Sequence, residues 1–237
     1  MAENKTLKAI KRIGLLGLGS RSTVFYLEQF NTAYNTRMGG YSTCPLVLLN
    51  SDFNEFNPYL PDQFSILVPA LKKYLNALSD LAVRKIIIPN ITLHECYDHI
   101  NKDLSINASS IVHPVTETIK KLQDDGHTQV VIFGSRYSIN STTLHDTFSS
   151  AGITLIIPHI DDIDNLEHLR QLVYTHQESA EDIKSFHQLI KQYQVQAPIV
   201  IACTELSVVL PPAATILTPY LYDMANIQIE HGLAEMA

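Results

Sequence analysis

A cysteine stands where an apolar run gives way to a helical pattern. Residues 199–202 read as a strand buried on both faces, and residues 206–210 fit a short amphipathic helix closed by Pro211-Pro212. Cys203 therefore falls in a strand-to-helix turn, outside the carboxyl end of the strand. Free N–H groups and the helix dipole favour a thiolate there, so we interpret Cys203 as a thiol that moves protons. The alternative is a small buried hydrophobic residue.

A second turn has the same plan. Residues 86–88 form another apolar run, and the polar residues Asn90 and Thr92 follow it. Two similar turns in the two halves of one chain indicate an internal duplication with a site between the halves. We therefore expect Asn90 and Cys203 to face each other across a cleft.

A glycine-rich turn opens the chain at residues 13–23. Its glycines permit a tight turn, and Ser20, Ser22 or Thr23 is expected to cap the helix that follows. The pattern begins like a dinucleotide fingerprint, but a serine stands where the third glycine belongs, and the ending of a P-loop is missing. A turn that binds a small carboxylate at the helix N-terminus is the favoured reading, and a purely structural turn is the alternative.

Composition limits the class of protein. The chain has 237 residues, of which 46% are hydrophobic and 17% charged, as in an ordinary globular protein. The net charge of -7 is spread out without a basic run, so we expect no nucleic-acid partner. The first twelve residues lack a long apolar core, which argues against a signal peptide or a membrane anchor. We expect a soluble cytoplasmic protein.

Cysteine and histidine usage excludes two further classes of site. The chain has 3 cysteines without a short regular spacing, which argues against a disulfide framework and fits a reducing compartment. Neither a Cys-x-x-Cys pair nor a His-Glu-x-x-His helix is present, so the sequence predicts no metal site.

Apolar runs and helical patterns alternate along the chain, which favours parallel sheets flanked by helices. Strands are expected from residue 13, before a polar turn at Asn50, and at 86–88, 129–133, 153–157, 199–202 and about 215–217. The clearest helical patterns lie at 64–78, 115–122, 161–174, 180–193 and 222–236. We predict an α/β fold of two pseudo-symmetric lobes, one made of residues 1–113 plus 211–237 and the other of 114–210, with the site in the cleft between them.

Five blocks carry a family resemblance. They are the Ile-Gly-Leu-Leu-Gly opening, Gly39-Gly40 before a strand ending in Asp52-Phe53, Thr92-Leu-His94, Gly134-Ser-Arg-Tyr-Ser138, and Ala202-Cys-Thr-Glu205. In this order, over nearly the whole length, the chain resembles the aspartate/glutamate racemase family, part of the Asp/Glu/hydantoin racemase superfamily.

The resemblance implies two similar α/β domains, a homodimer, and no cofactor such as pyridoxal phosphate. Members use two cysteines on opposite faces of the substrate α-carbon to remove and return a proton. The resemblance implies that Cys203 is the second of these and places Asn90 where the first is usual. An Asn amide hydrogen bonds but takes up no proton near neutral pH, so one catalytic thiol is left.

Polar side chains at the predicted turns are candidates for holding a substrate carboxylate and amine. They are Ser20, Asn50, Thr92, Ser135, Ser138 and Thr204. The arginine that aspartate racemases carry after the Asp-Phe pair is missing, and Asn165 is the nearest match to their lysine. Loss of both cations argues against aspartate, because a buried carboxylate needs a partner, and Arg136 or Arg21 is the candidate substitute.

The sequence hypothesis is a cofactor-independent racemase or isomerase acting on an amino acid or small carboxylate through Cys203. A decarboxylase or lyase on the same fold is the rival among enzymes, because protonating a carbanion from one face needs one acid. The rival from another class is a catalytically retired protein that binds a small carboxylate. A lowered thiol pKa and an accessible Cys203 would favour an enzyme.

Overall fold

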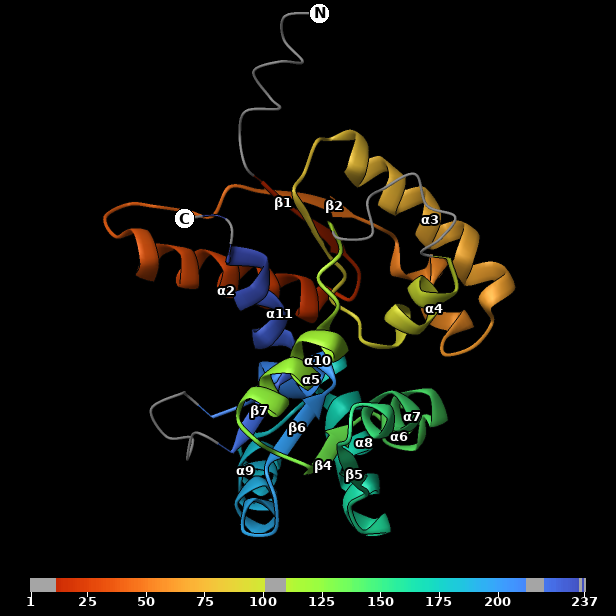
Figure 1. The fold of residues 1–237 in the computed structure, drawn as a ribbon, viewed down its shortest axis with the longest axis vertical. Helices are drawn as coiled ribbons and strands as arrows, with labels where there is room; N and C mark the ends of the chain where they lie inside the picture. The colour runs from red at the N-terminus through yellow and green to blue at the C-terminus, as the bar shows by residue number, and fades with distance from the viewer. Residues whose placement is uncertain (1–11, 101–109, 212–219, 235, 237) are drawn as a thin grey trace, which may run out of the picture. The chain divides into compact units, whose positions relative to one another are not determined.

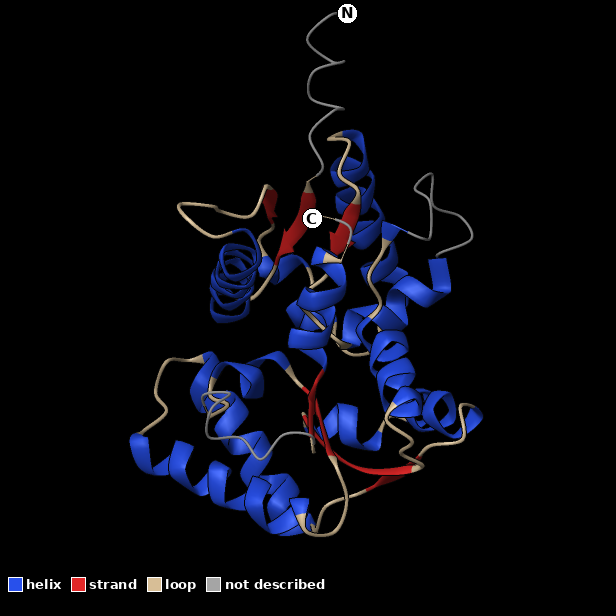
Figure 2. Cartoon of the chain, turned by 60° about the vertical axis from the view of Figure 1, so that its left-hand side comes forward, coloured by secondary structure: helices blue, strands red, loops and turns tan. Residues whose placement is uncertain are grey.

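A computed structural model describes residues 12–100, 110–211, 220–234 and 236. It divides into two compact units, unit 1 (Met1–His113 with Gln228–Ala237) and unit 2 (Pro114–Ile227). In each unit helices flank a parallel sheet (Figures 1 and 2), so the predicted α/β class with parallel sheets is confirmed. None of the described helices is long and apolar enough to cross a membrane.

The described strands of unit 1 form a parallel sheet in the order β2-β1-β3. They are β1 (Ile13–Gly17), β2 (Leu46–Asn50) and β3 (Lys85–Ile87). The helical elements are α2 (Ser20–Met38), the 3-10 turns η1 (Phe53–Glu55) and η2 (Asn57–Tyr59), α3 (Phe64–Asp80) and α4 (Thr92–Ile100). Helix α11 (Met224–Leu233) starts in unit 2 and ends in unit 1.

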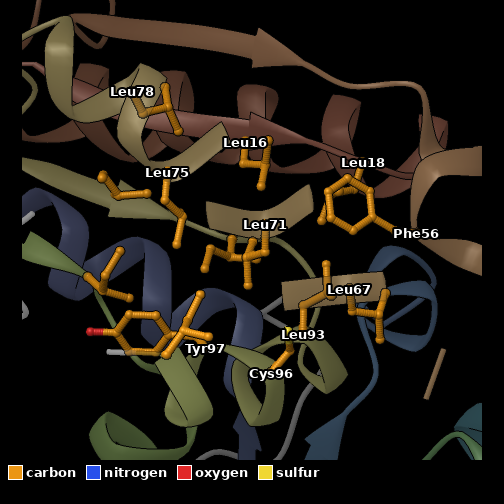
Figure 3. Packing of buried hydrophobic residues seen from close by; sticks show 14 residues of the cluster. Leu16, Leu18, Phe56, Leu67, Leu71, Leu75, Leu78, Leu93, Cys96 and Tyr97 are labelled. Carbon is orange, nitrogen blue, oxygen red and sulfur yellow. The ribbon is translucent and has the colours of Figure 1, made fainter. Parts of the chain in front are cut away.

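The core of unit 1 follows from the spacing of leucines on α3. Leu67, Leu71, Leu75 and Leu78 recur every three or four residues, so they lie on one face, and all are fully buried. Figure 3 shows them packed with residues of other elements. The labelled partners are Leu16, Leu18, Phe56, Leu93, Cys96 and Tyr97. This packing holds α3 and α4 against the sheet whose carboxyl edge carries the Asn90 turn.

The described strands of unit 2 are parallel and lie in the order β5-β4-β6-β7. They are β4 (Gln129–Gly134), β5 (Thr154–Ile156), β6 (Ile199–Ala202) and β7 (Leu221–Asp223). The helices are α5 (Pro114–Asp124), α6 (Arg136–Asn140), α7 (Thr142–Ser150), α8 (Ile160–Tyr174), α9 (Ala180–Gln194) and α10 (Thr204–Val208). β6 is buried along its whole length, as its unbroken apolar run predicts.

The end of the chain differs from the sequence prediction. The sequence predicts that residues 211–237 return to the first lobe, but β7 pairs with β6, with Ile201 opposite Asp223. Unit 2 therefore extends to Ile227, and unit 1 resumes at Gln228. The predicted helix from residue 222 starts at Met224 because the residues before it continue β7. The strand predicted at 215–217 lies outside the described residues.

Candidate active site

The carboxyl edge of the unit 2 sheet gathers several predicted site residues. β4 and β6 are neighbours, with Gly134 opposite Ala202, so the turns after them begin side by side (Figure 1). A Cβ on Gly134 would lie 3.1 Å from the Ala202 carbonyl oxygen and 3.1 Å from the Ser138 Cβ. Glycine therefore permits a close approach that a larger residue would crowd. The sheet brings the turn at Ser135 beside the turn at Cys203.

The Cys203 thiol has a carboxylate as its hydrogen-bond acceptor. Cys203 lies in the predicted strand-to-helix turn, where it is the N-cap residue of α10, and it is 6% exposed. Its Sγ donates to Glu205 Oε2 at 3.1 Å, and the Thr204 hydroxyl donates to the same oxygen at 3.2 Å. Glu205 is thus positioned to accept the thiol proton. The Cys-Thr-Glu motif is visible in the sequence, but no role for Glu205 was predicted from it.

The helix N-terminus favours a Cys203 thiolate, as predicted, but other effects set the direction of the pKa shift. Burial first, and then the charge and hydrogen bond of Glu205, raise the pKa of Cys203 well above its ordinary value. The Leu206 N–H and the charge of Arg170 act against this rise. Helix α10 has 5 residues, so its dipole is short, and burial and the carboxylate outweigh it. These effects together favour the protonated thiol.

Two hydroxyls on the neighbouring turn bond to each other. Ser135 is the N-cap of α6, and its Oγ accepts the Ser138 N–H at 3.1 Å. The two hydroxyl oxygens lie 2.9 Å apart, and Ser138 is buried. The pair therefore offers hydroxyl groups that are already oriented by the start of α6.

Helix α8 supplies an ion pair that sequence analysis missed. Arg170 donates two hydrogen bonds to Glu167, whose other oxygen accepts the backbone N–H of Arg136 at 3.0 Å. Although burial opposes both shifts, these bonds lower the pKa of Glu167 and raise that of Arg170. The charge of Arg170 acts on Cys203 and Glu205. Its spacing of three residues from Glu167 is the signal that sequence reading could have used.

The cation proposed from the sequence has another partner. The Arg136 side chain is bonded to Asp164 and is half exposed. Arg170, rather than Arg136, is therefore the arginine whose charge acts on the thiol. Asn165, the nearest sequence match to a lysine, is exposed on α8.

The carboxyl edge of the unit 1 sheet carries Asn50. Gly17 at the end of β1 is opposite Asn50 at the end of β2. A Cβ on Gly17 would lie 2.1 Å from Asn50 Oδ1, so the amide lies over the glycine. Ser51 extends this edge, because its buried hydroxyl donates to the Gly17 carbonyl at 2.7 Å. Glycine at position 17 is what allows Asn50 its place.

Asn90 acts as a helix cap. Its Oδ1 accepts the Leu93 N–H at 2.9 Å at the start of α4, and its backbone carbonyl lies 2.9 Å from His94 Nδ1. Because a carbonyl only accepts, His94 carries its hydrogen on Nδ1. Burial first, and His113 next, hold the pKa of His94 well below its ordinary value. Gln228 on α11 lies 3.4 Å from the other ring nitrogen.

Two predicted binding residues lie at helix starts. Thr92 is the first residue of α4 and is partly exposed, and Ser20 is the first residue of α2 and is exposed. The expected cap of α2 is wrong in one respect, since Gly19 is the N-cap without a side-chain bond. Ser22 instead donates to the Gly19 carbonyl, and Thr23 accepts the N–H of Leu18.

Comparison with known proteins identifies the family. A model of the Asp/Glu/hydantoin racemase family matches residues 12–231. This chain belongs to that family. Membership supports a racemase or isomerase function, and hence an enzyme. A search of curated protein sequences finds no match.

Solved racemase-family structures share the fold. An aspartate racemase homologue from Pyrococcus horikoshii has 16% identity and a TM-score of 0.79, covering 94% of this chain and 98% of that one. Picrophilus torridus aspartate racemase has 17% identity and a TM-score of 0.74, covering 94% and 93%. A maleate cis-trans isomerase from Nocardia farcinica, solved as a mutant with a covalently bound succinylcysteine intermediate, has 12% identity and a TM-score of 0.52, covering 94% and 91%.

In this racemase-family chain the two predicted catalytic positions belong to different units. Asn90 lies in unit 1 and Cys203 in unit 2, each after a parallel strand. That their side chains face each other stays a prediction. So do the substrate-binding roles of the polar residues at the two sheet edges.

Proposed function

We propose that this racemase-family protein is a cofactor-independent racemase or isomerase in which Cys203 moves a proton on the carbon next to a substrate carboxylate. The observation that carries the proposal is the 3.1 Å hydrogen bond from the Cys203 thiol to Glu205. A thiol acts as a base only after losing its proton, and Glu205 is positioned to take it.

The substrate would supply a positive charge that stabilises the Cys203 thiolate. In the protein as described, burial and Glu205 favour the protonated thiol. An ammonium group bound at this edge would stabilise the thiolate, because an opposite charge nearby favours the charged form. We therefore favour amino acids over carboxylic acids without an amine. Ser135, Ser138 and Thr204 would hold the substrate from unit 2, and Ser20, Asn50 and Thr92 from unit 1.

With one catalytic thiol, proton transfer is expected on one face of the substrate α-carbon only. The Asn90 amide acts neither as an acid nor as a base near neutral pH, and its side-chain oxygen Oδ1 already accepts the N–H of Leu93. Cys203 would therefore remove and return a proton on one face of the substrate. Exchange of the α-hydrogen would be faster than inversion.

A binding protein without turnover is the second candidate. The small exposure of Cys203 and its raised pKa favour this reading, because a structural thiol is buried and inert. The single thiol also suits covalent addition to an unsaturated carboxylate, of the kind named for the maleate isomerase mutant. The same experiment separates these candidates from the first.

The test is incubation of the full chain with a panel of amino acids and small carboxylic acids in heavy water. Mass gain reports exchange of the α-hydrogen. Wild type and Cys44→Ser, which alters another buried cysteine, are expected to exchange one panel member at similar rates. Cys203→Ser should exchange at least about 100-fold more slowly.

Each of the other possible results supports a different function or a different catalytic residue. Binding of a panel member without exchange would favour the binding protein. A mass gain retained on Cys203 itself would favour the covalent route. Exchange that survives in Cys203→Ser would show that another residue is the base.

A further inference from the structure

A buried carboxyl that the proposed function does not use lies close to the Cys203 turn. Asp223 ends β7, opposite Ile201 of β6, and is 6% exposed. Its carboxylate accepts the N–H of Ala225 at 3.2 Å and that of Asn226 at 3.4 Å. It therefore caps the N-terminus of α11.

Ser207 on α10 connects this carboxyl to Cys203. The Ser207 Oγ lies 2.6 Å from Asp223 Oδ1 and 3.2 Å from the backbone carbonyl oxygen of Cys203. Ser207 is buried, so water does not compete freely for its hydroxyl. Because a serine hydroxyl carries one hydrogen, it donates to one of the two oxygens at a time.

The ionisation of Asp223 decides which oxygen receives that hydrogen. An ionised carboxylate is a stronger acceptor than a backbone carbonyl, so it takes the hydroxyl hydrogen of Ser207. When Asp223 is protonated on Oδ1, it donates its own hydrogen to Ser207 Oγ. The Ser207 hydrogen is then left for the Cys203 carbonyl. No atom is lost or gained beyond the one proton that Asp223 exchanges with solvent.

We propose that Ser207 and Asp223 are positioning residues for Cys203, and that the turn carrying the thiol has two hydrogen-bonded states set by the protonation of Asp223. The Cys203 carbonyl accepts the Ser207 backbone N–H at 3.2 Å in both states. In one state it also accepts the Ser207 hydroxyl, and in the other it loses that second bond. The functional part of this role rests on the proposed catalytic role of Cys203. The two states themselves rest on the geometry of Ser207.

The surroundings of Asp223 allow this titration. Burial raises the pKa of Asp223 to about 6, while the bonds from Ser207 and from the first turn of α11 act to lower it. The titratable side chains nearest along β6 and α10 are Cys203 and Glu205, which bond to each other. On β7, Tyr222 bonds to Asp125. Among the described residues, no cationic side chain hydrogen bonds to Asp223.

The test follows the Cys203 carbonyl directly. The full chain labelled with carbonyl-¹³C cysteine gives a resonance for each of Cys44, Cys96 and Cys203, and loss of one peak in Cys203→Ser assigns the third. We expect the Cys203 peak to shift with a midpoint near pH 6, and the peaks of Cys44 and Cys96 to stay in place.

Variants assign the shift to its cause. Asp223→Asn removes the titrating group and Ser207→Ala removes the bridging hydroxyl, so each should abolish the shift. Ser207→Thr keeps the hydroxyl and should retain it. Ser141→Ala, which removes another buried serine hydroxyl of unit 2, should also retain it. If Asp223→Asn fails to fold, the three serine variants still decide the question.

The outcomes separate this proposal from the proposed function. A Cys203 peak that stays in place in wild type, or that still shifts in Ser207→Ala, overturns the two states. The shift needs no turnover, so it is readable even if no substrate exchanges. For an exchanging substrate, Ser207→Ala should slow exchange about 10-fold or more and Ser207→Thr should restore it, because a misplaced catalytic group loses rate steeply. An unchanged exchange rate in Ser207→Ala would remove the positioning role.

Discussion

At the scale of single residues, the hydrogen bond between Cys203 and Glu205 has two opposite effects. It gives the thiol proton an acceptor, which a base needs before it acts. It also places a carboxylate against the thiol, which raises the thiol pKa together with burial. Loss of the carboxylate should therefore raise the rate of Cys203 alkylation and lower the rate at which Cys203 exchanges a substrate proton.

The Glu205→Gln variant tests this separation. Without the negative charge the pKa of Cys203 falls, so alkylation of Cys203 by iodoacetamide at pH 8 should speed up. Exchange of the substrate α-hydrogen should slow about 100-fold, because the proton acceptor is lost. Peptide mapping reports the first rate, and Glu181→Gln, a change of an exposed glutamate on α9, is the control. Both rates moving in the same direction would refute the assigned role.

At the scale of elements, the sequence predicted the strands and turns better than the side-chain interactions around the turns. Unbroken apolar runs identified β4 and β6, and Ser135 and Cys203 were placed correctly in the turns after them, where the structure shows each as a helix N-cap. The direction of the Cys203 pKa shift was missed because it depends on burial and on the rotamer that brings Glu205 to the thiol. The pair of Glu167 and Arg170 was missed because its three-residue spacing shows that the two side chains can meet, but not that α8 packs beside α10.

Gly17 tests how closely β1 and β2 approach at their carboxyl ends. A Cβ at Gly17 would lie 2.1 Å from Asn50 Oδ1 and 3.0 Å from Leu48 Cδ1. Gly17→Ala should lower the free energy of unfolding by about 1–3 kcal/mol, because the Asn50 amide must move. In an Asn50→Ala background the same change should cost less. Urea denaturation of the four proteins gives the comparison, and equal costs in both backgrounds would show that Asn50 does not lie over the glycine.

At the scale of the whole molecule, buried titratable groups tie stability to pH in two directions. Asp223 has a raised pKa, so the folded state binds its proton more tightly than the unfolded state does. His94 has a lowered pKa, so its contribution is present above pH 6.5 and is lost as pH falls. The sequence predicted neither pKa shift, because both arise chiefly from burial. It also placed residues 221–227 in the first lobe, because the pairing of β7 with β6 is a long-range contact.

The contribution of Asp223 is isolated by comparison with Asp223→Asn. It is fully present below about pH 4, where the carboxyl is protonated even when unfolded, and it is lost as pH rises through about 6. From pH 4 to pH 7, the free energy of unfolding of wild type should fall relative to that of the variant by up to about 3 kcal/mol. Circular dichroism during urea denaturation at several pH values measures the difference. A difference that rises with pH would show that the folded protein favours the ionised carboxyl.

The central claim is that one thiol, Cys203, moves a proton on one face of a substrate while Asn90 supplies none. The most direct measurement follows mass gain and chirality together, in heavy water, for whichever compound exchanges. In wild type, exchange should outrun inversion by about 10-fold or more, because no acid delivers a proton to the other face. Asn90→Cys should bring the two rates together by raising inversion. Equal rates of exchange and inversion in wild type would contradict this mechanism, since inversion at that rate requires a second acid on the face opposite Cys203.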